Sequence, residues 1–223
     1  MGNFTLLGLR LAVYMLASLF VGLAVREYAR AWTAAKLGDP TPRLWGRITL
    51  RPKPWFEPFG SGFLPVLEAL VWSVQVFIMP AAYAKPAPVD ANYLRRHPRD
   101  VVLVSIAGPV ASLALSLVAG IALRGGLGGE AALLATTLAF TNASLLVFHL
   151  LPIPGLDGGR LLALVLPPQA REVFRNADRY LPLIVLIVLF VFTFVLGLAS
   201  VLTGAVCNAT TGRDCIARLS FGG

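Results

Sequence analysis

Three ionisable residues lie together near the end of the first apolar stretch, in the run Arg26-Glu27-Tyr28-Ala29-Arg30. Arg26 and Arg30 are four residues apart, so on a helix they share one face, with Glu27 beside them. This spacing is that of the zinc motif His-Glu-Xaa-Xaa-His, in which two imidazoles hold the metal and the glutamate activates water. A guanidinium group stays protonated and has no free lone pair, so arginine cannot replace those imidazoles as a ligand.

The composition of the chain places these charges in a membrane protein. The sequence has 223 residues, of which 57% are hydrophobic and 13% charged, whereas a soluble domain carries about 25% charged residues. We therefore predict an all-α membrane protein that forms one compact bundle. Ionisable side chains at membrane depth face the protein interior or a wet cavity and pair with one another. The three charges of the first segment thus need partners from other segments.

Five apolar segments are long enough to cross a bilayer, which takes about 20 residues each. The second contains Glu68, for which a position facing the bundle is the default and a position at the membrane interface the alternative. The fifth contains an uninterrupted apolar run, so we expect a helix that faces lipid. We predict a membrane core over residues 1–180 and a C-terminal region, this helix and a short tail, over residues 181–223. The five segments are residues 6–36, 63–84, 101–123, 131–151 and 181–206.

Two connections between these segments carry structural signals. Residues 43–50 follow a turn and alternate in the manner of a strand, which predicts a short β-hairpin after the first helix. Residues 152–159 contain two prolines and three glycines and interrupt the end of the fourth segment. Irregular backbone at membrane depth is tolerated only where it is buried in protein or lines a cavity. The second connection is therefore expected to lie inside the bundle.

The orientation of the chain in the membrane stays open at this stage. With five spans, the loops on each side carry eight Lys and Arg residues, so the positive-inside rule gives a tie. The two cysteines, Cys207 and Cys215, lie in the C-terminal tail. They form a disulfide if the tail faces an oxidising compartment and stay free thiols if it does not.

Five blocks of sequence, in order along the chain, resemble the site-2 protease family of intramembrane zinc metalloproteases, in particular its compact bacterial branch. Residues 26–31 resemble the family's His-Glu-Tyr-Ala-His-Ala, and residues 107–112 resemble Ala-Gly-Pro-Xaa-Ser-Asn. Residues 148–158 resemble Phe-Asn-Leu-Leu-Pro-Ile-Pro-Pro-Leu-Asp-Gly. The other two blocks are residues 38–52, similar to the segment after the first helix, and residues 83–89, similar to Trp-Ala-Lys-Pro-Val-Pro-Val. The match covers about residues 15–170 and implies the family's membrane bundle.

The resemblance also implies a site. It makes positions 26, 30 and 157 the zinc ligands, of which only Asp157 is retained, and it makes Glu27 the general base. Two guanidiniums and two carboxylates sum to zero charge, as zinc would with Glu27 and Asp157. We predict that Arg26 and Arg30 take the electrostatic place of the metal and bridge the first segment to Asp157 through charge-assisted bonds. Without a metal to activate water, Glu27 is interpreted as an ion-pair residue.

The sequence departs from the family pattern at the residues of the site itself. Ser112 and His149 stand where the family has asparagine. We predict a catalytically inactive relative without a cofactor, which acts as a structural, binding or regulatory subunit of a membrane complex. The alternative is an active intramembrane zinc metalloprotease whose rearranged site uses Glu27, His149 and Asp157. Otherwise His149 is a buried histidine that donates to a backbone carbonyl.

Composition and resemblance together predict the surroundings of the protein. The net charge of +8 comes from loops between apolar segments, which suits anionic lipid headgroups. No basic strip with interleaved aromatic residues occurs, so no nucleic-acid partner is expected. We expect an integral protein of the bacterial inner (cytoplasmic) membrane, in contact with lipid and with another integral membrane protein or membrane complex.

Overall fold

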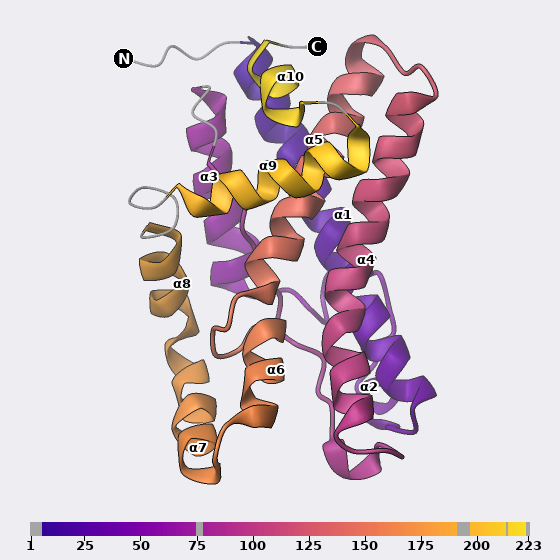
Figure 1. Ribbon diagram of the computed structural model, residues 1–223, viewed down its shortest axis with the longest axis vertical. Helices are drawn as coiled ribbons and strands as arrows, with labels where there is room; N and C mark the ends of the chain where they lie inside the picture. The colour runs from indigo at the N-terminus through magenta and orange to yellow at the C-terminus, as the bar shows by residue number, and fades with distance from the viewer. Residues whose placement is uncertain (1–5, 75–77, 191–196, 213, 222–223) are drawn as a thin grey trace.

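The computed structural model describes residues 6–74, 78–190, 197–212 and 214–221, and this part of the chain is helical and contains no β-strand. Long and short helices alternate with irregular segments, as Figure 1 shows. The elements are α1 (Leu6–Lys36), α2 (Thr41–Leu44), the π-helix η1 (Pro58–Phe63), α3 (Leu64–Ser73), η2 (Ala91–Tyr93), α4 (Arg99–Arg124), α5 (Gly129–Leu150), α6 (Asp157–Val165), α7 (Pro168–Asn176), η3 (Ala177–Tyr180), α8 (Leu181–Phe190), α9 (Leu198–Thr211) and α10 (Cys215–Phe221).

Three of these helices, α1, α4 and α5, are long and apolar enough to cross a membrane. They pack side by side and form the centre of the molecule (Figure 1). Gly22 of α1 lies against α5, where a Cβ atom would come within 2.7 Å of Leu145 Cδ1 and 2.8 Å of Asn142 Oδ1. A small residue at this crossing lets the two helices approach closely, as in other membrane bundles. The structure thus confirms three of the five predicted spans.

The second predicted span is not one long helix. Helix α3 has ten residues, and residues 78–90 return through the bundle as an extended segment without helix or strand. Side chains of α3 satisfy the backbone of this segment: Ala81 N donates to Glu68 Oε1 (2.9 Å) and Trp72 Nε1 donates to Ile78 O (3.1 Å). Glu68 therefore faces the bundle. These two bonds satisfy backbone groups of the segment that no helix or strand would satisfy.

The fifth predicted span is also not supported as a continuous helix. Helix α8 has ten residues, residues 191–196 lie outside the described part of the chain, and α9 begins after Gly197, whose φ is +59°. Helix α9 runs across the bundle instead of along it (Figure 1). The predicted count of five spans is therefore too high for the described residues, where three helices qualify. The division of the chain at residue 180 stays a prediction.

The predicted β-hairpin after the first helix is wrong. Residues 41–44 form the short helix α2, and Arg47 N then donates to Pro42 O (2.8 Å) in a turn. Asp39 holds this region: its Oδ1 accepts from Thr41 N and its Oδ2 from Asp90 N, both at 2.9 Å. The backbone is thus bonded to itself and to the segment before α4. The alternating residues have no neighbouring strand with which to pair.

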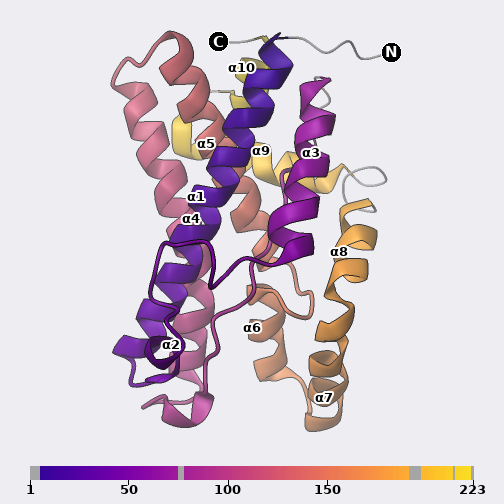
Figure 2. The same ribbon diagram turned by 180° about the vertical axis from the view of Figure 1, so that it is seen from behind.

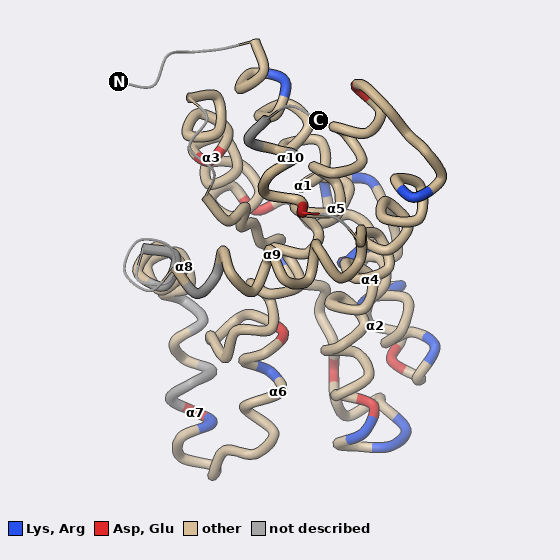
Figure 3. Tube along the Cα trace, turned by 45° about the horizontal axis from the view of Figure 1, so that its top comes forward, with Lys and Arg blue, Asp and Glu red and all other residues tan. Residues whose placement is uncertain are grey.

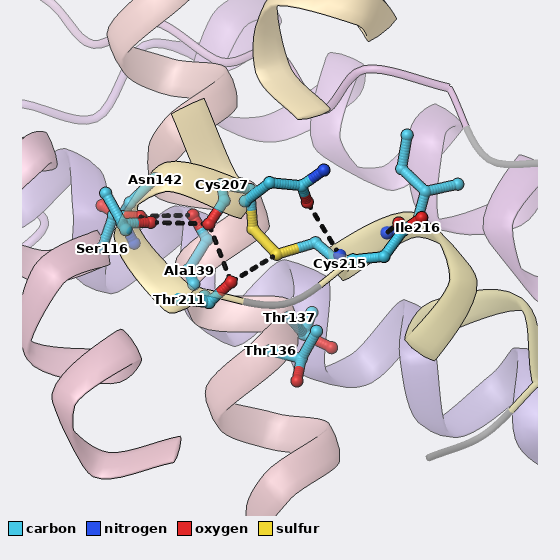
Figure 4. The surroundings of a disulfide bond; sticks show 12 residues. Ser116, Thr136, Thr137, Ala139, Asn142, Cys207, Thr211, Cys215 and Ile216 are labelled. Carbon is cyan, nitrogen blue, oxygen red and sulfur yellow. Dashed lines mark hydrogen bonds between the residues drawn. A yellow bond between two sulfur atoms is a disulfide. The ribbon is translucent and has the colours of Figure 1, made fainter. Parts of the chain in front are cut away.

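The two cysteines form a disulfide that joins α9 to α10 (Figure 4). Next to it, the hydroxyls of Ser116 on α4 and Thr210 on α9 are 2.8 Å apart, and Arg124 Nε donates to Thr211 O (3.2 Å). The C-terminal tail is therefore packed against the spanning helices.

The molecule has two distinct ends. Both termini and the turn between α4 and α5 lie at one end, while α2, the start of α4 and α7 lie at the other (Figures 1 and 2). At the second end Arg95 N donates to Leu37 O (3.4 Å), which joins the segment after α1 to the segment before α4. The equal count of Lys and Arg residues on the two sides assumed that the second segment crosses the membrane. Because it turns back, residues 36–43 and 95–99 share one end.

Candidate functional site: a buried charge cluster

Helix α1 carries three charged side chains into the interior of the bundle. Arg26, Glu27 and Arg30 have exposed fractions of 0%, 5% and 3%. Their helical spacing places them on the side of α1 that faces α4 and α6, where partners of opposite charge and hydrogen-bonding groups are available. The helix can therefore remain apolar toward its surroundings and still hold three charges.

Asp157 reaches the same place from the other side of the molecule. After α5 the chain turns through residues 151–156, where Ile153 N donates to Leu151 O (2.8 Å) and Leu156 N donates to Ile153 O (3.2 Å). Helix α6 then begins at Asp157, which is 1% exposed. Gly158 lies directly against the Leu150 carbonyl, where a side chain would not fit. The connection lies only partly inside the bundle, because Ile153 and residues 156–159 are buried while Pro152 is exposed.

The two arginines meet Asp157 from α1. Arg26 Nη2 donates to Asp157 Oδ2 at 2.6 Å, and Arg30 Nη1 lies 3.7 Å from Asp157 Oδ1. Arg30 Nη1 also donates to Glu27 Oε1 at 3.0 Å. Each carboxylate therefore has a guanidinium partner, and the four side chains form one continuous cluster that we call the buried charge cluster: Arg26, Glu27, Arg30 and Asp157. Its formal charges sum to zero.

Two further elements, the extended segment before α4 and α4 itself, form hydrogen bonds with the cluster. The sequence did not predict these contacts. Ala87 N, in the extended segment before α4, donates to Glu27 Oε2 at 3.2 Å, and Arg26 Nη1 donates to Ser112 Oγ on α4 at 3.1 Å. Both residues lie within the blocks that resemble the family. A backbone N–H or a serine hydroxyl does not, however, indicate from the sequence which group it will bond. The cluster thus ties together α1, α4, α6 and the extended segment.

Gly108 lets α4 approach the ion pairs. A Cβ atom at this position would lie 3.1 Å from Asp157 Oδ2 and 3.2 Å from Arg26 Nη2. These distances are tighter than ordinary carbon–heteroatom contacts, so a larger residue would push against the pair itself. The Gly108-Pro109 step of the third segment therefore marks close packing around the charges.

Known proteins of similar sequence identify the family. The chain is 33% identical, over 98% of its length and 96% of the relative's, to a protein of Bacillus subtilis named "Putative zinc metalloprotease YwhC". It is also 33% identical over 80% of its length to the "Putative zinc metalloprotease Rip2" of Mycobacterium tuberculosis, of which it spans 66%. The chain belongs to the site-2 protease family. No family model matches it, and no solved structure does.

A zinc ion, which the names of these site-2 protease relatives imply, does not fit the residues of this cluster. Among the residues that the structure describes, no group of three His, Cys, Asp or Glu side chains is placed to hold a metal. The buried side-chain groups that have no hydrogen-bond partner here are N–H donors: Arg26 Nε, Arg30 Nε and Arg30 Nη2. N–H donors cannot ligate a metal, and the two guanidinium cations already neutralise the carboxylates that a metal would need.

His149 lies at the end of α5, 5% exposed, with Nδ1 3.0 Å from Leu145 O. This is the geometry of an imidazole N–H that donates to a carbonyl of the preceding helical turn. The ring also meets Phe148 edge to face, with centroids 5.1 Å apart. These contacts hold the ring through packing and one backbone bond, and the described residues provide no ligand set around it.

The electrostatics of the site keep Asp157 charged. Burial on its own would raise the pKa of the Asp157 carboxyl, but the positive charges of Arg30 and Arg26 outweigh burial and lower this pKa below its ordinary value. Asp157 is therefore a carboxylate at neutral pH. Its charge is available to hold both guanidiniums.

Proposed function

We propose that this site-2 protease relative does not cleave peptide bonds and acts as a binding or structural subunit of a membrane complex in the bacterial cytoplasmic membrane. The observation that carries the proposal is the buried charge cluster, in which Arg26 and Arg30 satisfy the two carboxylates that zinc chemistry would need. Zinc hydrolases require three protein ligands and an open position for water. Here the carboxylates of Glu27 and Asp157 each have a guanidinium partner.

Metal analysis of the purified chain tests the inactive state. We expect less than stoichiometric zinc after growth in zinc-supplemented medium, and no change on His149→Ala, because this imidazole bonds to a backbone carbonyl. Elemental analysis by mass spectrometry measures both. Stoichiometric zinc that disappears with His149→Ala would contradict the proposal and favour the rearranged metal site of Glu27, His149 and Asp157.

A groove along α1 offers a place for the partner. It has a volume of about 480 Å³, lies between α1 and the segment that follows α2, and is lined by apolar residues only: Phe20, Val21, Ala24, Val25, Leu50, Pro52 and Trp55. None of the four cluster residues lines it, so a helix bound here would contact the apolar face of α1. We propose that the groove receives an apolar transmembrane helix of another protein, since such a helix matches an apolar lining of this size.

Photo-crosslinking in native membranes tests the groove. A photoreactive amino acid at Val21, which is 47% exposed in the groove, should yield a discrete crosslinked protein band. The matched control is Val118 on α4, which is also exposed but lies outside the groove and should crosslink to lipid only. Equal protein crosslinking at both positions, or lipid adducts alone at Val21, would contradict a partner helix at this groove.

A further inference from the structure

A second cleft, whose lining contains none of the four cluster residues, lies at the end of the molecule that carries α2 and α7. Its volume is about 410 Å³, and it opens between the start of α4, the segment before η2, and helices α6 and α7. We call it the basic cleft. Its lining residues are Val89, Ala91, His97, Val101, Gly155, Gly159, Arg160, Ala163, Leu164 and Arg171.

The lining of the basic cleft has two kinds of surface. Three nitrogen-bearing side chains come from three separate elements: His97 from the loop before α4, Arg160 from α6 and Arg171 from α7. No carboxylate is among the lining residues, and the others are apolar side chains or glycines. Guanidinium groups suit phosphate, with which they form charge-assisted and often bidentate bonds. The lining therefore matches a ligand with a phosphate at one end and an apolar remainder.

The apolar part extends beyond the basic cleft itself. A neighbouring cleft of about 360 Å³ shares Val89, Ala91, Val101 and Arg160 with it and continues along Pro86, Pro88 and Val104. A ligand whose phosphate lies near Arg160 thus finds an apolar path between the extended segment and α4. Neither lining contains Phe, Tyr or Trp, and His97 supplies the single aromatic ring among the lining residues, so the mostly apolar surface matches a phospholipid better than a nucleotide.

The basic cleft lies at one end of the molecule, and this end can be assigned to one side of the membrane. At this end of the molecule Figure 3 shows several blue segments near α2 and in the loop below it, and single blue segments on α6 and on α7. The end with the termini carries the disulfide Cys207–Cys215, a bond that persists on the oxidising side of a membrane. The positive-inside rule and the disulfide therefore agree that the basic cleft faces the cytoplasm, where anionic lipids attract basic segments.

We propose that the basic cleft binds an anionic phospholipid of the cytoplasmic leaflet, with the phosphate between Arg160 and Arg171 and one acyl chain along Val101 and Leu164. The proposal depends on membrane insertion and not on the absence of proteolysis. A phosphatidylglycerol headgroup has the required charge. Bound lipid would link α6 and α7 to α4 at an end of the molecule where these helices otherwise leave a cleft.

Native mass spectrometry of the full chain in detergent, titrated with phosphatidylglycerol, tests this site. We expect discrete one-to-one binding that weakens about tenfold or more in Arg160→Gln/Arg171→Gln, because each charge-assisted bond contributes about 1.5–3 kcal/mol and 1.4 kcal/mol corresponds to tenfold. The single variant Arg171→Gln keeps Arg160, which lies three residues after Asp157, and should fold normally. It should also weaken binding. Phosphatidylcholine, with no net charge, should bind weakly to every form.

The matched control removes two charges at the same end but outside the basic cleft. Arg43 and Arg96 are exposed and do not line it, so Arg43→Gln/Arg96→Gln should leave phosphatidylglycerol binding unchanged. An equal loss in this control would show diffuse attraction to a basic surface and would overturn the proposal. Full displacement of the lipid by millimolar inorganic phosphate would overturn it as well, since the site would then hold a soluble anion. Ala163→Trp, which narrows the apolar part with all charges kept, should also weaken lipid binding.

Discussion

Replacing Asp157 with asparagine should lower the free energy of unfolding by about 3–5 kcal/mol, the usual cost of removing one partner from a buried ion pair. Asparagine keeps the size and one hydrogen-bond acceptor but not the charge, so Arg26, at 0% exposure, would keep a buried charge without its counterion. For a chain of this size the loss corresponds to a fall of roughly 6–20 °C in melting temperature. Thermal unfolding of the detergent-purified protein measures it.

An exposed ion pair supplies the control for this prediction. Arg10 and Glu130 pair at the opposite end of the molecule, with side chains 54% and 56% exposed. Glu130→Gln should therefore change the free energy of unfolding by at most about 1 kcal/mol. Adding Arg26→Gln to Asp157→Asn should recover part of the loss, because the uncompensated charge is then gone. If Asp157→Asn is as stable as the parent, the cluster does not hold the helices together.

The sequence was sufficient for the three helices that cross the molecule, and insufficient for the two segments that do not. Residues 78–84 are as apolar as a spanning helix, and hydropathy measures only this property. Their extended form depends on bonds from side chains far away in sequence, such as Ser144 Oγ, which donates to Pro80 O, and Ser61 Oγ, which donates to Tyr83 O (2.8 Å). A buried extended segment and a buried helix cannot be told apart without these partners.

The hairpin failed for a related reason. Alternation of polar and apolar residues predicts a strand only where another strand is available for pairing. Residues 43–50 have none nearby, and Arg47 instead donates from Nη1 to Lys85 O (3.1 Å) in the extended segment. A pattern confined to eight residues could not reveal that contact.

The charge cluster shows what charge and spacing can and cannot predict. Spacing placed Arg26, Glu27 and Arg30 on one helical face and showed that they need partners. The family resemblance, which makes position 157 a ligand position, then supplied Asp157, more than 120 residues away in the chain. The structure brings these four side chains together. The contact with Ser112 and the donor from Ala87 were not predictable, because they arise from how α4 and the extended segment pack around the charges.

Restoring the two imidazoles should convert the cluster into a metal site. In Arg26→His/Arg30→His, two histidines on one helical face and Asp157 form a three-ligand set of the kind that zinc enzymes use. An imidazole with a zinc–nitrogen bond of about 2.0 Å spans about the same distance as the longer arginine side chain, so the metal would lie where the guanidinium groups now meet the carboxylates. We expect one zinc ion per purified chain, compared with substoichiometric zinc in the parent.

The double variant should also become dependent on metal for its stability. Without the arginines, Glu27 and Asp157 are two buried carboxyl groups that can stay ionised only with a bound cation, and zinc bound to folded ligand sets contributes on the order of 10 kcal/mol. A chelator should therefore lower its melting temperature sharply and leave that of the parent unchanged. Arg26→Gln/Arg30→Gln removes the same charges without adding ligands and should bind no zinc. Absence of zinc from the histidine variant would mean that positions 26, 30 and 157 do not surround a common point, and the family's ligand geometry would not apply to this chain.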